Sequence, residues 1–512
     1  MKKYITILLL IFLTVASCSD VLDIYPVENN SANQFYQTEL EMEQAVIGIY
    51  GRLSQYTDIP ALYYLQLSES RSDNWFMAQM PNAQRDQADI RRFQVNSQTG
   101  LVSEVYNRFY SIIADVNTLL SKSDESYSRF RAEASFLRAY AYFELVRSWG
   151  PQPVLLTPTE KQDALNAVRQ PESEVYNQII KDLLFAIDNL NEFYTGSEAG
   201  RVGSWAARTM LANVYATMAG YPLNDATAYQ KAVDVLSPVI NNMESRFAPN
   251  YTDIFDLDQE NKWDLFSVQF SSGGQGLGSS VPGFSTGGGS STETMFPEWV
   301  YSGFTTQGQD FRIDSLIIND MLDVDDVRAQ FPLFTKGYWD LRTPPENPTA
   351  ADSAANYIEK PYLMIKYLVR DNTNNSIKAW NDYPLNFPIL RVSDAYLLYA
   401  EALIGVGRPQ DAKQWVDKVR LRAGVNPLRS NPTIPDVMNE RRKEFLGEGK
   451  RYFDLVRQGE TIFVQSLKSF SDWYGNVAVF NGSEPTIRDM LLPIPQSVMN
   501  IHTDWDQNDD YS

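Results

Sequence analysis

Apolar residues recur every three or four positions along most of this chain, the spacing that places them on one face of an α-helix. The clearest case spans 131–154. Its apolar positions form two neighbouring rows, one of Ala134, Leu137, Ala141, Leu145 and Trp149 and one of Phe136, Tyr140 and Phe143. A helix with two apolar rows has to be covered on two sides, so we predict that it is buried between neighbours. Gly150 and the nearby Pro151 and Pro153 end it.

Six other stretches show the same helical period. They are 39–53, 102–120, 174–193, 204–218, 228–240 and 390–422. The last of them turns at Gly407-Arg408-Pro409 with the spacing of a tetratricopeptide repeat, and 204–218 forms a similar pair with 228–240 across a longer turn. We therefore predict a mostly α fold of tetratricopeptide-like helix pairs, with little β structure.

The helical pattern fades between 243 and 384, where turn-forming residues concentrate and 271–291 is rich in Gly and Ser. Aromatic residues flank the Gly/Ser run on both sides, among them Trp263, Trp299, Tyr301 and Trp339. A loop-rich insert of this length inside a helical protein is usually functional. We predict that the insert binds a ligand.

The first residues predict export and a lipid anchor. Lys2 and Lys3 precede an apolar run at 5–15, which is too short to span a bilayer, and small residues then lead to Cys18. Cys18 is the only cysteine of the chain, and it ends the run Val-Ala-Ser-Cys, which resembles a lipobox. We therefore predict that Cys18 is acylated. More than one acyl chain on this residue would anchor the protein stably to a membrane.

These features divide the chain into a lipoprotein signal peptide (1–17), a lipid tether (18–34) and a single domain (35–512). Within the domain we expect a helical scaffold in two parts, a loop-rich ligand-binding insert and a C-terminal segment. Their bounds are 35–242 with 385–470 for the scaffold, 243–384 for the insert and 471–512 for the C-terminal segment.

Composition narrows the function mainly by exclusion. A net charge of −20 opposes binding to nucleic acid phosphates and is compatible with a neutral ligand. One cysteine and one histidine exclude a Cys/His metal cluster, and they exclude a Ser-His-Asp triad away from His502. We expect no cofactor, no metal ion, no nucleic acid partner and no catalytic residue.

Four segments resemble the signatures of one known family. Residues 131–154 read RAEASFLRAYAYFELVRSWGPQPV, 391–402 read RVSDAYLLYAEA, 439–457 read NERRKEFLGEGKRYFDLVR, and Leu492-Pro-Ile-Pro is followed by Gln507-Asn508. In this order they resemble the SusD/RagB family, the nutrient-binding outer-membrane lipoproteins of Bacteroidetes. The resemblance implies a scaffold of about four tetratricopeptide-like helix pairs and a role in binding rather than catalysis, so we expect that the protein is not an enzyme.

The resemblance also implies a location and a partner. It implies a lipid-anchored protein on the extracellular side of the outer membrane that captures an oligosaccharide. The protein would deliver this ligand to a SusC-like TonB-dependent transporter, towards which its helical side would face.

The same resemblance, with the chemistry of sugars, suggests the binding residues. Sugars stack on aromatic rings, while amide and charged side chains bind their hydroxyls. Trp75 with Asn74 is the first candidate, because members of the family often use an aromatic residue in the loop at this place. The other candidates are Trp299, Tyr301, Trp339 and Trp263.

Three alternatives stay open at this point. The first is a RagB-like uptake lipoprotein that binds peptides. The second is a surface glycoside hydrolase with two carboxylates about 5 to 10 Å apart. The third is a scaffold that binds a peptide or protein in its tetratricopeptide groove.

The charged residues of the signature helices have a structural explanation. They lie on helices rich in apolar residues, so we predict buried or half-buried ion pairs that hold one helix against another. These residues are Arg131, Glu133, Arg138, Glu401, Glu440, Arg441, Arg442 and Asp454.

Overall fold

The computed structural model describes most of the chain from residue 35 onwards. The described residues are 35–54, 58–77, 85–159, 161–282, 311–313, 315–330, 333–336, 362–368, 377–474, 485–509 and 511. The predicted signal peptide, the tether and Cys18 lie outside them. Within the described residues, no helix is both long and apolar enough to cross a membrane.

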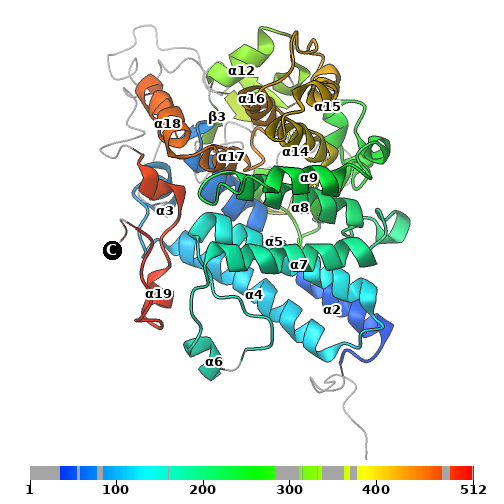
Figure 1. Ribbon diagram of the computed structural model, residues 1–512, viewed down its shortest axis with the longest axis vertical. Helices are drawn as coiled ribbons and strands as arrows, with labels where there is room; N and C mark the ends of the chain where they lie inside the picture. The colour runs from blue at the N-terminus through cyan, green and yellow to red at the C-terminus, as the bar shows by residue number, and fades with distance from the viewer. Residues whose placement is uncertain are drawn as a thin grey trace, which may run out of the picture.

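A stack of helices forms the body of the molecule (Figure 1). It rises from α2 and α4 at the bottom of the view through α5 with α7 and α8 with α9 to α14, α15 and α16 at the top. Their bounds are Glu39–Gly51 (α2), Gly100–Lys122 (α4), Ser128–Trp149 (α5), Glu172–Asn189 (α7), Ser204–Ala219 (α8), Ala228–Leu236 (α9), Val392–Gly405 (α14), Pro409–Arg422 (α15) and Ile434–Glu444 (α16). The predicted mostly α fold is confirmed. Helix α14 follows the insert in the sequence, yet it packs directly on α8 and α9, which precede the insert.

The remaining α-helices of the described residues have between four and fifteen residues. They are α3 (Arg85–Arg91), α6 (Lys161–Leu165), α12 (Ser315–Leu322), α17 (Arg451–Arg457), α18 (Glu460–Tyr474) and α19 (Gln496–Met499). A π-helical segment, η2 (Pro60–Ser68), and a 3-10 turn, η12 (Ile487–Met490), also contribute to the regions described below.

Helix α5 is buried between α4 and α7, as its two apolar rows predict. Ala134, Ala139 and Ala141 are fully buried, and their small side chains let the neighbouring helices approach closely. Gly150 ends the helix with a φ of 72°, a left-handed backbone that glycine adopts without strain.

Two small antiparallel sheets join the insert to the scaffold. β2 (Asp264–Val268) pairs with β6 (Phe387–Arg391), so the two ends of the insert lie side by side. The second sheet has the order β1-β3-β5-β4. Its strands are β1 (Trp75–Met77), β3 (Phe311–Ile313), β5 (Tyr362–Met364) and β4 (Phe334–Lys336).

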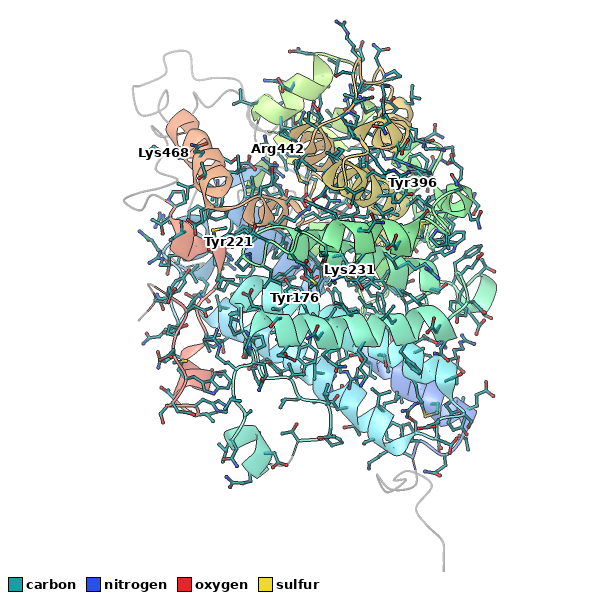
Figure 2. The ribbon with its side chains drawn as sticks, viewed as in Figure 1. Tyr176, Tyr221, Lys231, Tyr396, Arg442 and Lys468 are labelled. Carbon is teal, nitrogen blue, oxygen red and sulfur yellow. The ribbon has the colours of Figure 1, made fainter. Side chains whose placement is uncertain are left out.

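Seven of the eight predicted residues form ion pairs, and the pairs of Arg138, Glu401 and Arg441 join one α-helix to another. Glu133 pairs with Arg201, Arg138 with Asp182, Glu401 with Arg457, Glu440 with Arg328, Arg441 with Asp454, and Arg442 (Figure 2) with Asp73. The prediction is wrong for Arg131. Its guanidinium donates to the carbonyls of Leu120 and Ser123, where it caps the end of α4 instead of pairing with a carboxylate.

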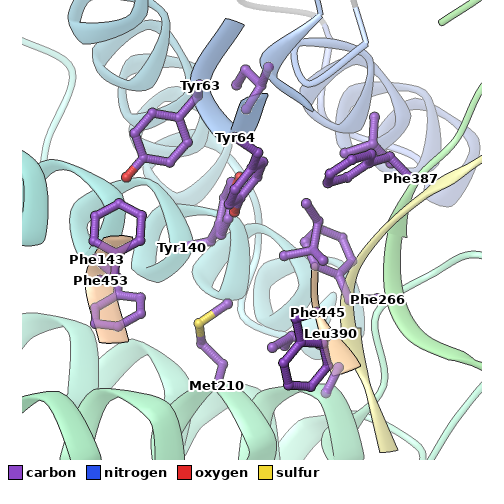
Figure 3. Packing of buried hydrophobic residues seen from close by; sticks show 14 of the residues in the cluster. Tyr63, Tyr64, Tyr140, Phe143, Met210, Phe266, Phe387, Leu390, Phe445 and Phe453 are labelled. Atoms are coloured by element: carbon purple, nitrogen blue, oxygen red, sulfur yellow. The ribbon is translucent and has the colours of Figure 1, made fainter. Parts of the chain in front are cut away.

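One hydrophobic core runs through the scaffold and the base of the insert (Figure 3). Rings from distant segments meet edge to face, for example Phe136 of α5 against Phe266 of β2, with centroids 5.0 Å apart. Tyr64 of η2 stacks on Phe387 of β6 at 5.7 Å. Because α5, η2 and both strands at the insert's ends share this core, the scaffold and the base of the insert form one packed unit.

Candidate functional site

Asn74 and Trp75, the first predicted ligand residues, lie inside the protein. Trp75 is in β1 rather than in a loop, and only 1% of it is exposed, so the predicted loop position is wrong. Asn74 is fully buried. Its Nδ2 donates to Glu69 at 2.8 Å, and its Oδ1 accepts from Arg442 Nε at 2.7 Å. In this arrangement neither side chain has a free surface for a sugar.

The turn around Asn74 is held by the third family-like segment, 439–457. Arg451 binds both carboxylate oxygens of Asp73, at 2.7 and 2.9 Å. The buried Glu69 accepts from the backbone amides of Gly447 at 3.0 Å and Gly449 at 2.9 Å. Burial raises the pKa of Glu69 to about 7, although these donors oppose the rise. These contacts give Asn74 and its neighbours a structural role.

We expect Asn74→Ala to lower the free energy of unfolding by about 1–3 kcal/mol, because it removes one buried hydrogen bond from Arg442 Nε and one from the Glu69 carboxylate. Urea unfolding measures the change. Asn107→Ala, at an exposed position of α4, is the matched control and should change stability by less than about 0.5 kcal/mol. Equal stability of the two variants would contradict the structural role of Asn74.

Trp263 is the other predicted ligand residue that the structure describes. It is half-buried just before β2, and Lys262 Nζ lies 4.5 Å from its ring centroid. Its indole Nε1 is buried and makes no hydrogen bond with the described residues. Trp263 precedes β2 of the two-stranded sheet, whereas Trp75 begins β1 of the four-stranded sheet and Asn74 precedes it.

Trp299, Tyr301 and Trp339 lie outside the described residues, and their roles stay predictions. Their segments join the fold at the four-stranded sheet. Phe311, which follows the segment of Trp299 and Tyr301, pairs with Met77 at the end of β1. Lys336, which precedes the segment of Trp339, pairs with Tyr362 of β5.

A cavity of about 630 Å³ lies elsewhere in the described structure. Its walls are the ends of α5 and α8, the first turns of α7, one side of α17, η12 and residues 507–509. Asn508 closes it on the C-terminal side, because its Nδ2 donates to the carbonyls of Trp149 at 2.9 Å and Leu492 at 2.7 Å. Arg169 donates to Asn508 Oδ1 at 2.6 Å.

Aromatic rings and charged groups share the lining of this cavity. Tyr176 of α7, Tyr221 after α8 (both in Figure 2) and Phe453 of α17 provide rings. Glu172 lies one turn before Tyr176, so the two side chains share a face of α7. Burial raises the pKa of Glu172, and the charge of Arg169 partly offsets the rise.

Two family models match consecutive parts of the chain. One is described as "Starch-binding associating with outer membrane" and matches residues 25–216, and the other is described as "SusD family" and matches residues 258–511. The chain belongs to the SusD/RagB family. The resemblance in the four sequence signatures is thereby confirmed.

Relatives of this SusD-like chain match it over nearly its whole length. A SusD-like protein of Bacteroides ovatus is 28% identical over 500 residues, which cover 93% of this chain and 86% of the relative. The starch-binding protein SusD of Bacteroides thetaiotaomicron is 23% identical, and the aligned residues cover 97% of this chain and 96% of SusD.

Solved structures share the SusD-like fold. A SusD homolog from Bacteroides thetaiotaomicron aligns with a TM-score of 0.78 at 21% identity, over 93% of this chain and 98% of the homolog. A laminarin-binding SusD-like protein aligns with a TM-score of 0.72 at 23% identity, over 93% of this chain and all of the other.

The sequence of this SusD-like chain contains little that predicts its cavity. Gln507 and Asn508 belong to the fourth signature, and Arg147 to the first, but nothing in them predicts that they lie together. Glu172 and Tyr176 have the spacing of one helical face, which many exposed pairs share. Glu172 and Tyr176 lie near the C-terminal segment because of contacts such as the one between Arg169 and Asn508, which are more than 300 positions apart in the sequence.

Proposed function

We propose that this SusD-like protein binds an oligosaccharide at the cell surface and does not transform it. The match along 97% of the chain to a protein named for starch binding carries this proposal. Two structures that share the fold support it. One is described as laminarin binding, and the other is a surface glycan-binding protein A of Bacteroides thetaiotaomicron in complex with laminarihexaose.

In this proposal the rings of the insert contact the sugar. Trp299 and Tyr301 are the leading candidates, with Trp339 and Trp263 beside them. The flat apolar faces of pyranose rings stack on such aromatic rings, which carry large contact areas at small entropic cost. Asn74 and Trp75 then have a supporting role, since Phe311, which follows the segment of Trp299 and Tyr301, pairs with β1.

The lipid anchor and the transporter complete the proposal. Acylation of Cys18 would hold the protein on the outer membrane, facing outwards, with residues 18–34 as a tether. A bound oligosaccharide would pass to a SusC-like TonB-dependent transporter as partner. The membership of the SusD/RagB family supports this partner.

Trp299→Ala tests the site. We expect it to weaken oligosaccharide binding by about 10- to 100-fold, the usual cost of removing a central aromatic contact, with no change in Tm. Calorimetry with laminarihexaose, maltohexaose and the best ligand of a glycan array provides the measurement. Phe185→Ala removes an exposed ring of α7 and should leave the affinity unchanged.

Other results would select an alternative function. Binding of peptides but of no glycan would favour a peptide-uptake role, and release of shortened sugars would show a hydrolase. Unchanged affinity in Trp299→Ala and Tyr301→Ala together would reject the assignment of the site to these rings.

A further inference from the structure

The cavity between α5, α7, α17 and the C-terminal segment is separate from the residues to which the proposed function assigns the glycan. None of Asn74, Trp75 and Trp263 lines it. Its volume of about 630 Å³ lies inside the range of about 300–1,000 Å³ that is typical of small-molecule sites. It is therefore large enough to hold a ligand of its own.

Two polar side chains of α7 reach this cavity without a partner. Neither the Glu172 carboxylate nor the Tyr176 hydroxyl forms a hydrogen bond with the described residues, although neighbouring polar groups are well satisfied. The contrast with Tyr221 is direct, because its hydroxyl donates to Glu460 at 3.0 Å. The Glu172 carboxylate is half-buried and the charge of Arg169 offsets only part of the cost of its burial, so a ligand that donates a hydrogen bond to it would be favoured.

Guanidinium groups from two other elements, Arg147 at the end of α5 and Arg488 of η12, supply donors to the lining of the cavity. Arg147 uses Nε and Nη2 to bind Glu144, and Arg488 uses Nε and Nη2 to bind Asp489 and the carbonyl of Phe93. The Nη1 group of Arg147 forms no hydrogen bond with the described residues, whereas Arg488 also contacts Tyr511, with its guanidinium carbon 4.9 Å from the ring centroid. Arg147 is held in place by the ring of Phe453, whose centroid lies 3.6 Å from its guanidinium carbon.

This set of groups fits a hydroxyl-bearing ligand better than a simple ion. An amine needs only acceptors and an anion only donors, whereas each sugar hydroxyl both donates and accepts. The cavity offers an acceptor in Glu172, donors in Arg147 and Arg488, and both in Tyr176. The rings of Tyr176 and Tyr221 supply the apolar surface that the carbon faces of a sugar need.

We infer that this cavity is a second carbohydrate site, which holds an end of an oligosaccharide through Glu172, Tyr176 and the two arginines. The inference rests on the proposed function, because it takes the same class of ligand. It assigns that ligand to different residues, which allows the two sites to be tested apart.

A cysteine placed at the cavity mouth reports on the cavity alone. Ile487 lines the cavity and is 51% exposed, and the only natural cysteine is removed by Cys18→Ser. The full chain with Cys18→Ser and Ile487→Cys is labelled with a maleimide in the presence of laminarihexaose or maltohexaose. We expect one of these sugars at ten times its Kd to slow labelling by about tenfold, because about a tenth of the sites stay empty.

Matched variants test whether the protection of the cysteine at position 487 from labelling depends on Glu172 and Tyr176. Added to the same background, Glu172→Gln and Tyr176→Phe should each weaken the protecting affinity by about tenfold or more. Glu174→Gln changes an exposed carboxylate in the same turn of α7 and should leave protection intact. Leu184→Cys, at a 45% exposed position of α7 outside the cavity, should be labelled at the same rate with and without sugar.

The outcomes separate this inference from the proposed function. Suppose that calorimetry detects sugar binding, that Trp299→Ala abolishes it, and that no sugar protects the cysteine at position 487. This result contradicts the second site and agrees with the proposed function. No binding of any oligosaccharide overturns both. Protection by trilysine but not by sugars, or protection that Glu172→Gln and Tyr176→Phe leave unchanged, also overturns the inference.

Discussion

Glu444→Gln should lower the free energy of unfolding by about 3–5 kcal/mol, the usual cost of breaking a buried ion pair from one side. Glu444 lies at the end of α16 and is fully buried. Its carboxylate binds Arg391 at 2.6 Å, Arg328 at 3.3 Å and Arg422. Glutamine has nearly the same shape but no charge, so the variant keeps the packing and leaves three arginines with less compensation.

The surroundings of Glu444 make this loss hard to repair. Arg391 also binds Glu448 at 2.9 Å, which in turn binds Lys366 at 3.0 Å, and all three residues are almost completely buried. Arg328 and Arg391 are each only 1% exposed, so a guanidinium stranded there is not hydrated by bulk water. The cluster joins α16 to β6 and to residues 326–328, so its loss weakens the connection between the insert and the scaffold.

The loss of stability caused by Glu444→Gln should become smaller as the pH falls. Burial alone would raise the pKa of Glu444, but the charges of Arg422, Arg391 and Arg328 lower it well below its ordinary value. A carboxylate with a lowered pKa stabilises the folded state above its unfolded pKa of about 4.5, and this stabilisation disappears as the pH falls. The difference between the natural chain and the variant should therefore be constant near neutral pH and become smaller below about pH 4.5.

Urea unfolding of both proteins at neutral pH and at pH 3.5 measures this difference. Glu174→Gln, an exposed carboxylate of α7, is the control and should behave as the natural chain does. A difference of less than about 1 kcal/mol at neutral pH would show that the cluster tolerates the missing charge, as some buried ion pairs tolerate replacement.

Gly449→Ala should also be strongly destabilising, by about 2–5 kcal/mol from backbone strain and overpacking together. Gly449 has a φ of 72°, and a Cβ added there would lie 2.6 Å from the Cβ and the carbonyl oxygen of Tyr64. Tyr64 belongs to η2 and lies in the core, where it cannot move freely. The same shift would weaken the hydrogen bond from the Gly449 amide to Glu69.

Gly407→Ala separates the two contributions. Gly407 has a similar φ of 79°, but no atom lies within 4 Å of a Cβ built there. Its replacement should therefore cost only the left-handed strain, about 1–2 kcal/mol. Thermal and urea unfolding of the two variants compare them directly. Equal losses would mean that the contact with Tyr64 relaxes at no cost.

The sequence by itself determined the helical scaffold and the family. The apolar rows of α5 and the repeat spacing around Gly407 predict local structure, because the period of apolar residues depends only on the geometry of one helix. It also predicted that the charged signature residues pair between helices, since a charge on a buried helix needs a partner. Their partners, such as Asp182 for Arg138, were not predictable from local spacing.

Only the tertiary structure decided how the predicted site residues lie. Trp75 follows a turn-like run in the sequence, yet its strand pairs with β3 and its ring is closed off inside the protein. Arg131 caps a helix that ends nine residues earlier, at Lys122, which no pattern of charges indicates. The cavity joins Glu172 to Arg488 and to residues 507–509. A local pattern shows which face of a segment is apolar, but which distant segment covers that face depends on the packing of the whole chain.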